Sequence, residues 1–259
     1  MQIAVWTERF LGTKAYAESF LKLIDSVDGG RWRPERANSC EPIRRHYSDE
    51  SKPVLIEEWT WQRGQDGWVA NTILFKRRAP NFIAMVDVRR GKSTPALNRI
   101  HLWLDAREFD SQHGPERIIS IVQALVTWSD AAYASAWRTG QSHHRSAPGT
   151  PMERLDQLDW LTFFGEPYLK MLGQAVVKEA GFSEVRELGS GVIALATARP
   201  DSVELTESPD LLLSLEKRLG EDVFADEHGS ENVRRTPHFD LRETVMSNAV
   251  EGSEGVRTN

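Results

Sequence analysis

The sequence contains one cysteine among 259 residues, so an intramolecular disulfide bond is impossible. Stability must therefore come from packing, and a reducing compartment is the simplest setting. Cys40 has no nucleophile motif around it, which favours a buried or partly buried structural thiol. Apolar runs fall short of the roughly 18 residues that span a bilayer. The first ten residues also lack the basic and apolar regions of a signal peptide. These absences predict a soluble, cytoplasmic protein without a membrane partner.

The composition excludes several protein classes. Hydrophobic residues make up 40% of the chain and charged residues 27%, and there are nine tryptophans. Such a composition is typical of a folded globular protein and not of collagen, a coiled coil or a disordered chain. No repeat of fixed period is present, and the length allows one large domain or two small ones.

The net charge of −6 is unevenly divided along the chain. Residues 1–150 carry 21 Lys and Arg against 17 Asp and Glu, whereas residues 151–259 carry 11 against 21. The basic residues of the first half are scattered, so we expect no direct contact with nucleic acid. The acidic second half suits a basic protein partner, although an ordinary solvated surface explains the same excess.

Apolar residues at steps of three and four predict two helices in the first half, over residues 14–27 and 115–137. Pro115 suits the first position of the second helix. Periodicity is absent over residues 31–51 and 138–157, which we expect to be loops.

Four short runs separated by Gly, Pro and Asn predict strands over residues 54–61, 72–78, 82–89 and 99–107. The last run alternates Ile100, Leu102 and Leu104 with polar residues, which is typical of an antiparallel strand with one covered face. We therefore expect an antiparallel meander with helices on one side.

In the second half, Pro167 can begin a short helix that Gly173 ends, and the sequence GSG at 189–191 indicates a hairpin tip. Ser208 before a proline predicts the start of a helix that Gly220 ends. The fold class that these elements predict is α+β, an antiparallel β-sheet packed by helices. We expect a single globular unit over residues 1–224, with a flexible, polar C-terminal tail over 225–259.

Familiar catalytic motifs are missing from the sequence. Neither phosphate-binding glycine pattern occurs, and no serine has the spacing of a nucleophile elbow. His143 and His144 are adjacent in a polar loop without nearby ligands, so a solvated loop is the simpler interpretation. Asp87 lies on a predicted strand, but residues 88–90 are not the acid, spacer and lysine of a metal-dependent nuclease. We predict no catalytic residue, metal or cofactor, and the alternative is a metal-dependent hydrolase or nuclease of unrecognised family.

Tryptophans and neighbouring aromatic residues provide the remaining candidates. Trp59 and Trp61 share one face of a predicted strand, and an exposed pair would be a candidate protein contact. The aromatic segment after residue 158 is instead expected to be core, because adjacent large apolar groups more often pack than bind. Its structural motif consists of Trp160, Phe164, Gly165, Pro167 and Tyr168.

Three segments of the second half resemble bacterial immunity proteins of polymorphic toxin systems. They are DWLTFFGEPYLKMLG at 159–173, VRELGSGVIALATA at 185–198 and PDLLLSLEKRLG at 209–220. The segment GGRWRPERANSCEPIRRHY at 29–47 is most similar to the immunity protein 52 family. The resemblance spans residues 1–225, but related immunity families share the second-half pattern. The glycine–aspartate pair that one such family has after its last strand is missing.

The resemblance implies a non-catalytic protein that binds and neutralises a cognate secreted toxin, encoded beside it. For the immunity protein 52 family, the implied toxin is a nuclease effector with a restriction-endonuclease-like fold, commonly delivered by type VI secretion. Nucleases present basic residues to phosphates, so an inhibitor gains fast association from carboxylates. The acids that we single out as toxin contacts are Glu221, Asp222, Asp226 and Glu227. A solvated helix end that runs into the tail is the alternative explanation for them.

Overall fold

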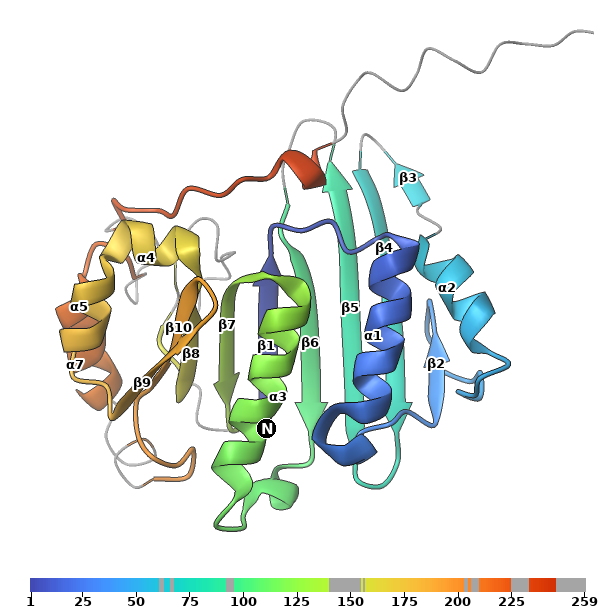
Figure 1. The fold of residues 1–259 in the computed structure, drawn as a ribbon, viewed down its shortest axis with the longest axis horizontal. Coiled ribbons are helices and arrows are strands. Elements are labelled where there is room, and N and C mark those ends of the chain that lie inside the picture. Colours follow the sequence, from blue (N-terminus) through green and yellow to red (C-terminus); the bar gives the residue numbers. More distant parts are fainter. Residues whose placement is uncertain are drawn as a thin grey trace, which may run out of the picture.

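The structure is a computed structural model that describes residues 1–60, 63–65, 68–91, 96–139, 155, 157–202, 205, 210–224 and 233–245, with the backbone alone at 63–65, 68 and 69. Strands in these residues form one antiparallel sheet in the order β2, β4, β5, β6, β1, β7, β8, β10 and β9, and β3 pairs with β4 beside this path (Figure 1). The strands are β1 (Gln2–Thr7), β2 (Arg36–Asn38), β3 (Arg63–Gln65), β4 (Trp68–Arg77), β5 (Phe82–Gly91), β6 (Asn98–Leu104), β7 (Ala131–Trp137), β8 (Leu161–Phe164), β9 (Glu184–Leu188) and β10 (Gly191–Leu195). The helices are α1 (Lys14–Ser26), α2 (Lys52–Thr60), α3 (Gly114–Ser129), α4 (Glu166–Leu172), α5 (Gln174–Glu179) and α7 (Asp210–Leu219), with 3₁₀ helices η1 (Val27–Gly30), η2 (Ala106–Phe109) and η3 (Arg242–Thr244). The predicted α+β class and antiparallel sheet are confirmed.

Helices α1, α2 and α3 meet the sheet in an aromatic cluster. The ring centroid of Phe20 on α1 lies 5.4 Å from Trp59 on α2, 5.5 Å from Phe75 on β4 and 5.0 Å from Trp128 on α3. Phe20, Trp59 and Phe75 are fully buried. These three helices therefore cover one and the same face of the sheet, and Figure 1 shows α1 and α3 lying across it.

The strand predicted over 54–61 is wrong, because Lys52–Thr60 forms the helix α2. Leu55 and Trp59 are one helical turn apart and both fully buried, so they form the inner face of a helix. Val54, the first residue of the predicted strand, is 43% exposed.

The helix predicted over 115–137 ends at Ser129, where the chain turns through Asp130 into β7. Asp130 has a φ of 49°, in the left-handed region that ends many helices. All seven residues of β7 are buried between β1 and β8. Its small residues suit a helix face and a buried central strand equally, so hydrophobic spacing alone did not separate the two.

Two strands in the middle of the sheet were not predicted. β1 lies between β6 and β7, with Ile3 opposite both Leu102 and Ala136, and β8 lies between β7 and β10. β8 is short and buried on both faces, so it lacks the alternation that marks a half-exposed strand. β1 is also short, and only Gln2 and Trp6 are partly exposed, so its alternation is weak. The short helix after Pro167, the hairpin at 189–191 and the last helix are confirmed, whereas Ser208 lies outside the described residues.

Residues 233–245 run back across the domain, from the side of α4 to the end of β5 (Figure 1). The ring centroid of Phe239 lies 6.0 Å from that of Tyr168, and Val245 forms a β-bridge with Gly91. The expected boundary at residue 224 thus falls short of this packed segment, which we call the C-terminal segment. The rest of the expected tail, 225–232 and 246–259, lies outside the described residues, as does most of the predicted loop 138–157.

None of the described helices is both long and apolar enough to cross a bilayer.

Candidate functional site

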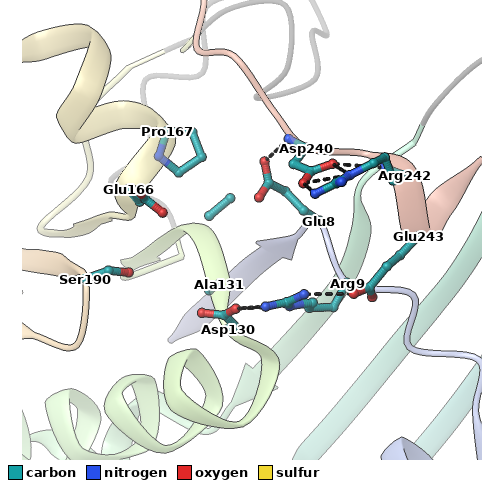
Figure 2. Close-up of a pocket in the computed structure, with 11 residues that line it drawn as sticks. Glu8, Arg9, Asp130, Ala131, Glu166, Pro167, Ser190, Asp240, Arg242 and Glu243 are labelled. Atoms are coloured by element: carbon teal, nitrogen blue, oxygen red, sulfur yellow. Dashed lines mark hydrogen bonds and ion pairs between the residues drawn. The ribbon is translucent and has the colours of Figure 1, made fainter.

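A cleft of about 500 Å³ opens where the end of β1, the turn between α3 and β7, the start of α4 and the C-terminal segment meet (Figure 2). Five carboxylates and two guanidinium groups line it, together with Ala131, Ala132, Pro167 and Ser190. The charged residues are Glu8, Arg9, Asp130, Glu166, Asp240, Arg242 and Glu243. We call this site the acidic cleft.

The turn at Asp130 fixes one wall of the acidic cleft. The backbone N–H of Asp130 donates to the carbonyl of Val126 and closes α3. The hydroxyl of Thr7, at the end of β1, donates to the carbonyl oxygens of Ser129 at 2.6 Å and of Asp130 at 3.3 Å. The backbone of the turn is therefore tied to the central strand, which places Asp130 at the edge of the cleft.

Arg9 connects this wall to the C-terminal segment. Its Nε and Nη2 donate to Oδ2 of Asp130 at 3.0 and 2.7 Å, and its Nη1 donates to Oε1 of Glu243 at 2.7 Å (Figure 2). The backbone N–H of Phe10 donates to the other carboxylate oxygen of Glu243 at 3.2 Å. One guanidinium group thus holds together three segments that are far apart in the sequence.

The third wall begins at Gly165, where β8 leaves the sheet and α4 starts. The N–H of Gly165 donates to the carbonyl of Ala132 at 3.0 Å. A Cβ at this position would lie 2.6 Å from the carbonyl oxygens of both Ala131 and Ala132, a distance that side chains do not adopt. Glycine is therefore required here, and it brings Pro167, in the first turn of α4, to the cleft. Tyr168, the next residue, is fully buried.

The C-terminal segment forms the remaining wall. The backbone N–H of Asp240 donates to Oε1 of Glu8 at 2.7 Å, and the carboxylate of Asp240 accepts hydrogen bonds from the guanidinium of Arg242. Thr244 is fully buried behind these residues. The cleft is therefore completed by a part of the chain that the sequence placed in a tail.

The lining of the acidic cleft carries a formal excess of three negative charges, from five carboxylates and two guanidinium groups. Burial raises the pKa of Glu8, the hydrogen bond from the N–H of Asp240 opposes this shift, and the charges of the Asp240 and Asp130 carboxylates add to it. The hydrogen bonds from Arg242 lower the pKa of Asp240, and those to Asp130 and Glu243 raise the pKa of Arg9. Because these negative charges lie close together, binding of a cationic group in the cleft is electrostatically favourable.

The ion pairs restrict the chemistry that the acidic cleft supports. Arg9 binds two of the carboxylates, Arg242 binds a third, and Lys170 approaches Glu166 to 2.7 Å. Carboxylates that already have cationic partners can exchange them for the cations of another molecule. Within the described part of the chain, no three His, Cys, Asp or Glu side chains are placed so that they could hold a metal ion.

Of the acids predicted as toxin contacts, the structure describes Glu221 and Asp222, and neither lines the acidic cleft. Glu221 is exposed beyond the end of α7. Asp222 accepts two hydrogen bonds of 2.7 Å from Arg235 of the C-terminal segment, which lower its pKa. Asp222 therefore holds that segment in place, and Asp226 and Glu227 lie outside the described residues.

The proposed contact role of Trp59 is wrong. Its side chain is fully buried, and its indole N–H donates to the carbonyl of Leu11 at 2.7 Å, so it is a core residue. Trp61 lies outside the described residues. Cys40 is exposed, so the expectation of a buried or partly buried thiol is wrong.

The aromatic motif packs as the sequence predicted. Trp160, Phe164 and Tyr168 are buried, and the indole N–H of Trp160 donates to the carbonyl of Thr197 at 2.9 Å. Tyr133 on β7 packs 5.1 Å from Tyr168, between ring centroids. The motif is therefore structural, although Gly165 and Pro167 also shape the acidic cleft.

A buried polar cluster lies under α7. Asp159 is buried, and burial raises its pKa to about 7, while hydrogen bonds from Ser135 and Gln157 oppose this shift and the charge of Glu216 adds to it. Glu216, also buried, accepts a hydrogen bond of 2.9 Å from the N–H of Leu158. The carboxyl groups of Asp159 and Glu216 are thus both buried and close enough to interact, which lowers the stability of the fold when both are charged.

Sequence reasoning missed the residues of the acidic cleft because they are spread from Glu8 to Glu243 and form no local motif. The available signal was Asp130, a turn-forming residue inside the helix predicted over 115–137. The chain matches no protein-family model, and no curated protein is significantly similar to it, so the acidic cleft is interpreted from its own chemistry.

Proposed function

We propose that this chain is an immunity protein that binds and neutralises a secreted toxin in the cytoplasm of the cell that produces it. The toxin class that we propose is a nuclease effector with a restriction-endonuclease-like fold, delivered by type VI secretion. The observation that carries this proposal is the acidic cleft, with its excess of three negative charges. The resemblance of the sequence to immunity proteins adds the biological setting.

The chemistry of a nuclease explains why such a cleft suits a toxin. A nuclease presents Lys and Arg side chains to the phosphates of its substrate. A cleft lined by carboxylates attracts those cations over a distance and raises the association rate. Hydrogen bonds from Arg9 to Asp130 and Glu243, and from the N–H of Asp240 to Glu8, orient these carboxylates before binding, which reduces the entropy lost on association.

The alternative from the sequence, a metal-dependent hydrolase or nuclease, needs carboxylates that are free to bind a metal ion or to move a proton. In the acidic cleft Asp130 and Glu243 share Arg9, and Asp240 is paired with Arg242. These ion pairs favour the binder over the hydrolase.

The proposal is tested with the toxin domain encoded beside the gene for this chain. Co-expression should rescue cells from the toxin, and the two purified proteins should form a stoichiometric complex. The double variant Glu8→Gln with Glu166→Gln removes two negative charges from the acidic cleft. It keeps an acceptor for the N–H of Asp240. We expect association to slow by about tenfold at low salt, and less at high salt.

The matched control is Glu57→Gln with Glu179→Gln, two exposed carboxylates on α2 and α5 that lose the same charge elsewhere. It should bind within about twofold of the wild type, because steering depends on where the charges lie. A wild-type chain that neither binds the toxin nor protects cells rejects the proposal. Equal association rates for the two double variants would reject the acidic cleft as the contact.

A further inference from the structure

The sheet has a second face, opposite to α1, α2 and α3, which is half-exposed over β4, β5 and β6. On β6 the side chains alternate between buried and partly exposed along the whole strand. The buried ones, such as Ile100 and Leu102, belong to the core under the helices. The other set points away from them, and in Figure 1 this is the side of the sheet behind α1 and α3. We call it the open face.

The middle of the open face is apolar. Strand register places Leu74 opposite Met85, and Ile83 opposite Trp103, on three adjacent strands. All four side chains are half-buried. Met and Trp are enriched in the centres of protein interfaces, where flexible and large apolar groups fill the surface of a partner. We call these four residues the apolar centre.

Beside the apolar centre, His101 and Trp103 stack on each other with ring centroids 3.8 Å apart and an interplanar angle of 27°. The amide oxygen of Gln2 lies 3.2 Å from Nε2 of His101 and can accept a hydrogen bond from it. Burial, and then the charge of Arg99, lowers the pKa of His101 to about 4. His101 is therefore neutral at pH 7 and extends the apolar surface.

Basic side chains surround the apolar centre. Arg36 and Lys76 are opposite each other on β2 and β4 and both exposed, and Arg89 and Arg99 lie on β5 and β6. We call these four the basic rim.

One carboxylate, Asp87, opposes the basic rim, and it is only 6% exposed. Its Oδ2 lies 2.7 Å from Arg99 and 3.7 Å from Arg89, and Thr72 donates to its other oxygen at 2.8 Å. Asp87 thus orients two arginines whose side chains stay 35% and 47% exposed. Four cations against one buried anion give this described surface a clear positive charge, opposite to that of the acidic cleft.

We propose that the open face docks an acidic region of the toxin, with the apolar centre at the middle of the contact and the basic rim paired with carboxylates of the toxin. This inference rests on the proposed function, because it names a second contact on the same partner. Complementary charge favours an acidic partner, because all four cations of the basic rim attract its carboxylates.

Two other occupants fit the face less well. Single-stranded nucleic acid needs open aromatic rings for its bases, but His101 and Trp103 cover one face of each other, and the remaining centre is aliphatic. A second copy of this chain, docked face to face, would bring two basic rims together. Like charges at an interface cost binding energy.

The test uses the purified toxin domain and the full chain. The variant Arg36→Glu with Lys76→Glu reverses two exposed charges of the basic rim. The matched control, Lys22→Glu with Lys217→Glu, makes the same change at exposed positions on α1 and α7. We expect the rim variant to bind the toxin at least about tenfold more weakly than the control, with an unchanged melting temperature. Met85→Ser should weaken binding as well, with little change in its salt dependence.

The outcomes separate this inference from the proposed function. A wild-type chain that does not bind the toxin rejects both. A wild-type chain that binds, with rim variant and control equal in affinity, rejects the open face alone. Binding of an oligothymidylate strand that the rim variant abolishes would replace the toxin by nucleic acid. Self-association in sedimentation that the rim variant abolishes would replace it by a second copy, and either result overturns the inference.

Discussion

Arg9 and Asp130, 121 residues apart in the sequence, form a pair in which two guanidinium nitrogens meet one carboxylate oxygen at 3.0 and 2.7 Å. The two side chains are 45% and 62% exposed, so water screens the pair and its contribution to stability is small. The pair instead fixes the position of Arg9, which also binds Glu243 and so connects the end of the first strand to the C-terminal segment.

The first prediction concerns this connection. Arg9→Met should lower the free energy of unfolding by less than about 1 kcal/mol, since exposed ion pairs contribute little. It should however speed hydrogen exchange of the N–H of Phe10, which depends on the position of Glu243. Exchange measured by NMR or mass spectrometry checks this. Unchanged exchange at Phe10 would show that Arg9 does not hold the segment.

The second prediction concerns Gly165. Gly165→Ala should destabilise the protein by roughly 3 kcal/mol, because the new Cβ meets two backbone carbonyls that cannot move independently. The control is Gly189→Ala, at a hairpin tip with a φ of 59° and open space around it, where only backbone strain of about 1 kcal/mol applies. Denaturant titration compares the two. A smaller loss for Gly165→Ala than for Gly189→Ala would contradict the close approach of β8 to β7.

The third prediction concerns the buried carboxyl of Asp159. Its pKa is raised by burial from 3.8 to about 7, so the folded state holds a proton that the unfolded state has released over that range. The contribution of Asp159 to the free energy of unfolding is therefore fully present below about pH 4. It is lost as the pH rises to about 7, by up to about 1.4 kcal/mol per pH unit.

Asp159→Asn should remove this slope, which urea titrations between these pH values would measure. Glu57→Gln, at an exposed carboxylate, should keep the wild-type slope. A variant at position 159 that retains the full pH dependence would assign the effect to another group.

The fourth prediction concerns the C-terminal segment. A chain that ends at residue 232 loses the packing of Phe239 on Tyr168, the pair of Arg235 with Asp222 and the buried Thr244. We expect it to be less stable by about 2 to 4 kcal/mol than a chain that ends at Val245, which keeps all of these contacts. Thermal unfolding of the two truncated proteins checks this. Equal melting temperatures would show that the segment adds nothing to the fold.

The sequence predicted those parts of the fold in which one side of an element faces water. β6 alternates buried and partly exposed residues, and the pattern around Ile100 and Leu102 was sufficient to identify it. The pattern failed where both sides are buried, as in β7, and where a helix and a strand share the same apolar residues, as at Leu55 and Trp59. In these places tertiary packing decides the structure.

The acidic cleft could not be predicted, for a different physical reason. Glu8, Asp130 and Asp240 meet only because β1 lies next to β7 and the C-terminal segment returns to both. No local spacing encodes such a meeting. By contrast, the aromatic motif around Gly165 was found because its residues act within one short segment, although its second role in the cleft was not visible.

The central position of β1 has a consequence for how the chain folds. Residues 2–7 are synthesised well before their partners in the sheet, which are residues 98–104 and 131–137. The edge that pairs with β6 therefore waits until residue 104 has been synthesised, and the edge that pairs with β7 waits until residue 137. Contacts of such long range make folding slow and place its decisive step late. Because β1 joins the two halves of the sheet, neither half can complete its core first, and unfolding should proceed as one cooperative transition.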